Sequence, residues 1–106
     1  MTEVSIDQLA AAKADGAFVV DVREPGEYVQ GHVAGAELVP LSEVPQRAAA
    51  LPTHQPVYVI CASGNRSARA AEFLRAAGLD AYSVDGGTAG WIRAGNPVVT
   101  GPDASV

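Results

Sequence analysis

Three short apolar runs, each followed by a turn and then by a helical pattern, constrain the fold of this chain more than any other feature. They occupy residues 17–22, 56–60 and 80–84. Their length and their content of Val, Ile and Tyr indicate β-strands, and the near-continuous apolar run at 17–22 favours a central one. Strands that alternate with helices predict an α/β fold with a mostly parallel central β-sheet flanked by helices on both faces.

Capping and turn signals predict the remaining elements. Ser5 and Gln8 have the spacing of a capping box, and Val4 and Leu9 that of the accompanying hydrophobic staple, so a short helix should end at Gly16. We further expect a short helix beginning at Pro25, a turn-rich segment at 31–35, a strand at 36–39, a helix from Ser42 to about Ala50, and a last short helix up to Gly95. Residues 1–106 should form one domain, in which about 97–106 make a loosely ordered C-terminal tail.

The charge balance and the cysteine count exclude several classes of protein. A net charge of -5 argues against binding to nucleic acid or to an anionic membrane. The single cysteine leaves no internal disulfide, and with two histidines it makes no convincing metal site. The sequence begins without a signal-peptide pattern and has no run of membrane-spanning length, so we expect a cytoplasmic location and no cofactor.

The cysteine lies at the most informative position in the sequence, between a predicted strand and a predicted helix. The loop reads Cys61-Ala62-Ser63-Gly64-Asn65-Arg66-Ser67. The helix that follows should span 68–77, with one apolar stripe made of Ala70, Phe73, Leu74 and Ala77.

A loop of this kind can stabilise a negative charge at its centre. Gly64 permits a tight turn, and Asn65 tolerates left-handed backbone geometry. The first turn of the helix leaves N–H groups unpaired and carries partial positive charge, to which Arg66 adds a full one. If Cys61 Sγ lies at the centre, its pKa should fall below that of a free cysteine. These residues favour a nucleophile over a buried packing cysteine.

The order of the motifs resembles that of the rhodanese family of sulfurtransferases. Five fragments carry the resemblance: the helix Ser5…Leu9, Asp21-Val22-Arg23-Glu24, residues 31–36, Cys61-x-x-Gly64-x-Arg66-Ser67, and Gly86-Gly87…Trp91. Each fragment is weak alone, but together they span nearly the whole chain. The similarity is to the small single-domain members of the family.

The resemblance implies a double-displacement reaction. Cys61 would take the outer sulfur of a donor such as thiosulfate and carry it as a persulfide to cyanide or a thiol. Cys61 and Arg66 are the expected catalytic residues, with Arg66 binding the oxygens of the departing anion. The expected substrate-binding residues are Ala62, Ser63, Gly64, Asn65 and Ser67.

The loop length separates this expectation from a related chemistry. Related phosphatases place one more residue between the cysteine and the arginine than the four found here. A smaller ring suits a sulfur atom better than a phosphate, so we expect no useful phosphatase activity.

Structural roles are expected for other noticeable residues. Asp21 and Arg23 should form an ion pair, His32 should bond to backbone in a turn, and Trp91 should be a packing anchor.

Other functions stay open. The donor could be mercaptopyruvate, or the chain could be a relay module that receives its persulfide from a protein partner. A domain in which Cys61 senses reactive sulfur or oxidants is a third hypothesis.

Overall fold

The computed structural model describes residues 2–104. The strands are β1 (Glu3–Val4), β2 (Phe18–Asp21), β3 (His32–Val33), β4 (Glu37–Leu38), β5 (Val57–Ile60), β6 (Ala81–Val84) and β7 (Val98–Val99). The α-helices are α1 (Ile6–Ala14), α2 (Pro25–Gln30), α3 (Val44–Arg47), α4 (Asn65–Ala76) and α5 (Gly87–Arg93), and two 3₁₀ turns, Leu41–Glu43 and Ala48–Ala50, flank α3.

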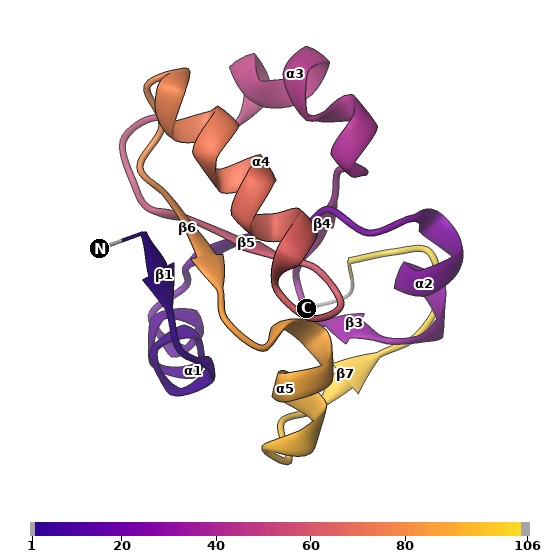
Figure 1. Cartoon of the computed structure of the whole chain (residues 1–106). Helices are drawn as coiled ribbons and strands as arrows, with labels where there is room; N and C mark the ends of the chain where they lie inside the picture. The colour runs from indigo at the N-terminus through magenta and orange to yellow at the C-terminus, as the bar shows by residue number, and fades with distance from the viewer. Residues whose placement is uncertain (1, 105–106) are drawn as a thin grey trace.

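The central sheet is parallel and carries helices on both faces, which confirms the predicted α/β fold. Its strand order is β1-β6-β5-β2-β4, and each neighbouring pair runs parallel. Figure 1 shows α3 and α4 on one side of the sheet and α1 and α5 on the other. The β5 strand lies at the centre, between β6 and β2, and the residue that follows it is Cys61.

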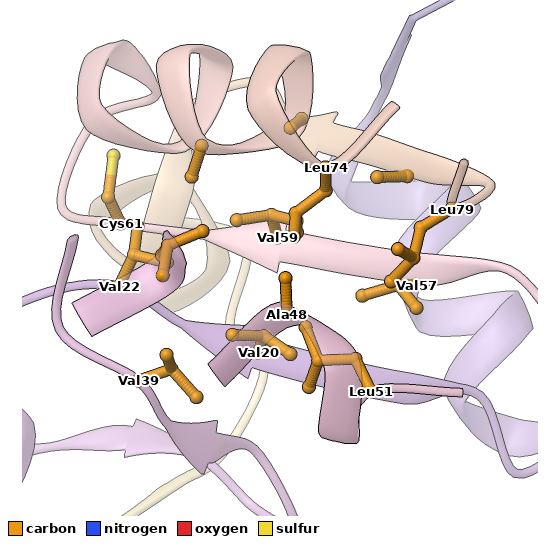
Figure 2. Packing of buried hydrophobic residues seen from close by; sticks show 14 residues of the cluster. Val20, Val22, Val39, Ala48, Leu51, Val57, Val59, Cys61, Leu74 and Leu79 are labelled. Atoms are coloured by element: carbon orange, nitrogen blue, oxygen red, sulfur yellow. The ribbon is translucent and has the colours of Figure 1, made fainter. Parts of the chain in front are cut away.

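Alternating side chains of the central strands divide the core into two clusters. Val20 and Val59 pack with α4 and the segment around α3, whereas Val19 and Ile60 pack against α1 and α5. All four are buried, as expected for strands covered on both faces. Cys61 belongs to the first cluster, and Figure 2 shows it at one end of that cluster with its sulfur directed toward α4.

The first helix has the predicted start. The Ser5 hydroxyl accepts from Gln8 N at 3.1 Å, and the Gln8 side chain accepts from Ser5 N at 2.8 Å. Val4 and Leu9 lie in the same buried cluster, as a hydrophobic staple requires. Val4 also belongs to β1, a two-residue strand missing from the sequence analysis because two residues carry no periodicity.

The segment 41–50 is helical, but it is not one helix capped by Ser42. Ser42 lies inside the first 3₁₀ turn, whose N-cap is Pro40. Val44 N donates to Leu41 O, which closes a tight 3₁₀ turn before α3 begins.

Helix α4 begins three residues earlier than the predicted start at Ala68. Gly64 is its N-cap, so Asn65, Arg66 and Ser67 form the first turn rather than a loop. The buried face is therefore rotated relative to the prediction and consists of Ser67, Ala70, Ala71 and Leu74. Phe73, predicted to be buried, is 43% exposed, and Ala77 is exposed as well.

The C-terminal segment, expected to be loosely ordered, makes specific contacts as far as the structure describes it. Its Val98–Val99 strand pairs antiparallel with His32–Val33. Further along, Gly101 N donates to Val29 O, and Gly35 N donates to Ala104 O, both at 2.9 Å. The two prolines and the glycine in this segment obscure a strand of only two residues; residues 105–106 lie outside the described part of the chain.

Within residues 2–104, no helix combines the length and the apolar character needed to cross a membrane.

Candidate active site

Cys61 lies where β5 ends, and the loop toward α4 closes around its sulfur. Gly64 N donates to Sγ at 3.1 Å, and Ser67 Oγ lies 3.4 Å from Sγ in hydrogen-bonding geometry. Gly64 makes this turn with φ 117°, a left-handed conformation that favours glycine. A Cβ at Gly64 would find its nearest neighbours at 3.6 Å or more, so the backbone conformation, and not a clash, calls for glycine there. Asn65 needs no left-handed geometry because it is already helical.

The loop lowers the pKa of the Cys61 thiol, as predicted. Burial has the largest single effect and raises the pKa, because Cys61 is only 1% exposed. The hydroxyl of Ser67 and the backbone N–H groups of Ser67, Gly64 and Ser63 act in the opposite direction and outweigh burial. A thiolate is thus favoured in a site that is largely shielded from water.

A second serine, not identified from the sequence, supports this arrangement from β6. Ser83 Oγ lies 2.7 Å from Ser67 Oγ, and Ser67 Oγ also donates to Gly64 O at 3.1 Å. Both serines are buried, at 1% and 0% exposure. The sequence did offer a signal for Ser83, since it lies inside a predicted buried strand and a buried hydroxyl needs a hydrogen-bond partner.

The N-terminus of α5 fixes the carbonyl side of the same loop. Thr88 N and Thr88 Oγ1 donate to Cys61 O at 2.8 and 3.0 Å, and Ala89 N donates to Ala62 O at 3.1 Å. A Cβ on Gly87 would lie 2.5 Å from Ala62 O and 2.6 Å from Cys61 O. Glycine at this position therefore lets α5 approach the cysteine loop closely.

Arg66 is held by a carboxylate from another helix. Its Nη1 and Nη2 donate to Glu27 Oε1 and Oε2 of α2, at 2.7 and 2.9 Å. The hydrogen bond from Arg66 is the main reason that the pKa of Glu27 falls to about 2. In turn, the bond to Glu27 raises the pKa of Arg66. The sequence analysis did not identify Glu27, since 39 residues separate it from Arg66.

A pocket of about 370 Å³ opens beside the cysteine loop. Its lining residues are Arg23, Glu27, Gln30, Gly31, Ala62, Thr88, Ala89 and Ile92. Ala62 follows Cys61 in the chain and Thr88 donates to the Cys61 carbonyl, so this pocket adjoins the backbone of the cysteine loop. We call it the mouth pocket.

The predicted ion pair between Asp21 and Arg23 is present at the edge of the mouth pocket. Arg23 Nη2 donates to Asp21 Oδ2 and to Gly31 O, both at 2.8 Å, and the two side chains are almost fully buried. His32 is buried and bonds to backbone, as expected: its Nδ1 and Nε2 lie 2.8 and 2.9 Å from the carbonyl oxygens of Tyr28 and Asp103.

Comparison with known proteins places this site in a family. The model of the rhodanese-like domain matches residues 5–94. The chain belongs to the rhodanese family.

Individual relatives agree with that assignment. The thiosulfate sulfurtransferase GlpE of Pseudomonas entomophila is 37% identical over 89 residues, which cover 83% of this chain and 82% of that protein. The uncharacterised protein YqhL of Bacillus subtilis is 43% identical over 76 residues, which cover 71% of this chain and 60% of that protein. Among solved structures, a rhodanese-related protein from Thermoplasma volcanium has a TM-score of 0.88 and 38% identity, with 93% of this chain and 98% of that chain covered.

In this rhodanese domain, the predicted site residues do not all face the sulfur. Gly64 and Ser67 contact it, and Ser63 contributes its backbone N–H while its side chain is exposed. Ala62 lines the mouth pocket, whereas Asn65 is exposed on the first turn of α4. Arg69, the other cation near the cysteine in sequence, lines a separate groove between α3 and α4. No cluster of three or more potential metal ligands occurs among residues 2–104.

Proposed function

We propose that this rhodanese domain is a sulfurtransferase that moves sulfane sulfur from thiosulfate, or a similar donor, to cyanide or a thiol through a persulfide on Cys61. The observation that carries the proposal is the buried Cys61 sulfur, whose pKa is lowered by the loop that surrounds it. The naming of GlpE relatives as thiosulfate sulfurtransferases supports the choice of donor.

The first half-reaction loads the enzyme. The Cys61 thiolate attacks the outer sulfur of thiosulfate and forms a new S–S bond. The S–S bond of the donor breaks, and its electron pair leaves with sulfite. The enzyme then holds a Cys61 persulfide, which is negatively charged like the thiolate that it replaces.

The second half-reaction empties the enzyme. Cyanide, or a thiolate, attacks the terminal sulfur of the persulfide and bonds to it. The S–S bond on Cys61 breaks, and its electron pair returns to Sγ, so that the thiolate is regenerated. Both half-reactions require a site that stabilises a charged sulfur, which is the property of the Ser63, Gly64 and Ser67 donors.

Arg66 is the residue proposed to bind the departing anion, by analogy with the family motif. In the structure its guanidinium is engaged with Glu27, at 2.7 and 2.9 Å. An anionic donor must therefore compete with a carboxylate for Arg66. This pairing favours, as the second candidate, a relay module that receives sulfur from a protein persulfide.

Intact-mass spectrometry of the purified protein tests the proposal. Excess thiosulfate should add the mass of one sulfur atom to the wild-type chain, and cyanide should remove it with release of thiocyanate. The matched control Cys61→Ser, which differs by one atom, should stay unmodified throughout.

The other outcomes select among the alternatives. Loading by mercaptopyruvate, or by a cysteine desulfurase with its substrate, but not by thiosulfate, would replace the donor or favour the relay. If no donor adds sulfur to Cys61, the sulfurtransferase proposal fails and a sensing role for this cysteine takes its place.

A further inference from the structure

We propose that Glu27 is a specificity-determining residue that disfavours dianionic sulfur donors and favours donors of lower charge. This inference rests on the proposed function, because it concerns the donor that loads Cys61. It assigns to Glu27 a role in selecting substrate by charge.

The position of Glu27 places a carboxylate beside the cysteine loop and against Arg66, the residue proposed to bind an anionic donor. Glu27 lines the mouth pocket together with Ala62, the residue that follows Cys61. Its side chain is 38% exposed, so its charge faces the solvent from which the donor arrives.

The carboxylate is also held in place from two sides. Its Oε1 accepts from Glu24 N at 3.0 Å within the capping box of α2, and its two oxygens accept from Arg66. The hydrogen bond from Arg66 is the largest cause of a pKa of about 2 for Glu27. Glu27 is therefore ionised throughout the neutral range.

The charges around the mouth pocket cancel in pairs. Among the described residues that line it, Arg23 carries the positive charge, and Asp21 neutralises it at 2.8 Å. Arg66 is neutralised by Glu27 in the same way. A thiosulfate dianion thus meets no net positive charge at this pocket, and the net charge of -5 on the whole chain repels it further. It must also displace a carboxylate to reach the guanidinium.

Two donors that differ by one unit of charge make the test specific. Thiosulfate is a dianion, and methanethiosulfonate is a monoanion in which a methyl group replaces one oxygen. Both deliver the same outer sulfur to Cys61, and they release sulfite and methanesulfinate, respectively. With cyanide as acceptor, thiocyanate formation gives kcat/KM for each donor.

The variant Glu27→Gln removes the charge and keeps an oxygen that can accept from Glu24 N. We expect kcat/KM to rise for both donors, and the ratio of thiosulfate to methanethiosulfonate to rise about threefold or more, mainly through KM. Added salt should raise kcat/KM for thiosulfate in the wild type and have less effect in the variant.

Two further variants separate charge from position. Glu72→Gln makes the same change in net charge at an exposed position on α4 and should leave the donor ratio within about twofold of the wild type. Glu27→Asp keeps the charge but shortens the side chain, so it disturbs the ion pair and should also leave the ratio within about twofold.

The proposal is overturned if Glu27→Gln leaves the donor ratio unchanged or lowers it, or if Glu27→Asp raises it as much as Glu27→Gln does. Such results would mean that Glu27 only positions Arg66. Wild-type protein that loads from either donor, as seen by intact mass, would keep the sulfurtransferase proposal in that case. Loading from neither donor would end the proposal for Glu27, and the sulfurtransferase proposal would then depend on loading by mercaptopyruvate or by a protein persulfide.

Discussion

Ser67 Oγ has a single hydrogen and three polar neighbours. Cys61 Sγ, Gly64 O and Ser83 Oγ lie 3.4, 3.1 and 2.7 Å from it. A thiol can donate to Ser67 Oγ while that hydroxyl donates to Gly64 O. A thiolate can instead accept the hydrogen of Ser67, while Ser83 donates to Ser67. The serine pair can therefore adapt to both charge states of Cys61 without movement of the backbone.

The first prediction concerns this hydroxyl. Ser67→Ala should raise the pKa of the Cys61 thiol, because it removes a donor that stabilises the thiolate. Near neutral pH, the rate of alkylation by iodoacetamide should fall by about threefold to tenfold, the effect of losing one hydrogen bond. The pH profile of alkylation measures the shift. Ser63→Ala, which changes only an exposed side chain in the same loop, is the control, and coincident profiles for all three proteins would contradict the prediction.

The second prediction follows from the pKa of Glu27, which drops from 4.5 to about 2 on folding. A carboxyl group with a lowered pKa stabilises the fold above its unfolded pKa, and this stabilisation is lost as the pH falls through the folded value. The free energy of unfolding of Glu27→Gln should therefore lie below that of the wild type at neutral pH. The two values should converge between about pH 4.5 and pH 2. Because both partners are more than a third exposed, the difference should stay below about 1 kcal/mol.

Urea titrations at several pH values measure this difference. Glu72→Gln serves as the control for a general change in net charge. A gap between wild type and Glu27→Gln that widens as the pH falls would show that the ion pair does not stabilise the fold.

At the scale of elements, the packing of α5 on the cysteine loop leads to the third prediction. Gly87→Ala would place a Cβ 2.5 Å from Ala62 O at a φ of 60°, so either α5 or the loop must move. We expect a loss of about 2–4 kcal/mol in the free energy of unfolding, together with slower sulfur loading.

Gly16→Ala is the matched control for Gly87→Ala. Gly16 has a φ of 83°, but nothing lies within 4 Å of the added Cβ. It therefore carries the backbone strain without the clash, and should cost about 1 kcal/mol and leave loading unchanged. Equal effects of the two variants would mean that the close approach of α5 is unimportant.

The helix that follows the cysteine shows how far a pattern in sequence can go. Its existence, its place after a strand and the lowered pKa of Cys61 could all be predicted. Its start could not, because Asn65-Arg66-Ser67 has no apolar residue to mark a buried face. The predicted stripe therefore included Phe73 and Ala77, which are exposed, and omitted Ser67 and Ala71, which are buried. A stripe that includes the buried hydroxyl of Ser67 is invisible to a search for apolar residues.

At the scale of the molecule, the central sheet could be predicted from the sequence, whereas the contacts between segments far apart in the chain could not. The main strands are short apolar runs, and alternation with helices determines that they are parallel. The pair Glu27–Arg66 and the pairing of β3 with β7 join distant, mostly polar or very short segments. Neither has a periodic signal, and each depends on where the completed sheet places its loops.

The last prediction tests whether the C-terminal segment is part of the folded structure. Val98–Val99 pairs with β3, and Val98 Cγ2 would lie 3.4 Å from a Cβ on Gly31, the residue whose carbonyl accepts from Arg23. Deletion of residues 98–106 removes this strand and the Asp103 carbonyl bonded to His32. We expect a loss of about 2–4 kcal/mol in the free energy of unfolding, because a buried polar side chain loses a partner and buried apolar surface is exposed.

Hydrogen exchange at the amide of Val33 should accelerate, whereas exchange in β5 should change only as much as the global stability does. Val98→Asp in the full-length chain keeps the segment but disfavours its packing, and it should shift stability in the same direction. An unchanged unfolding curve for both variants would support a loosely ordered segment instead.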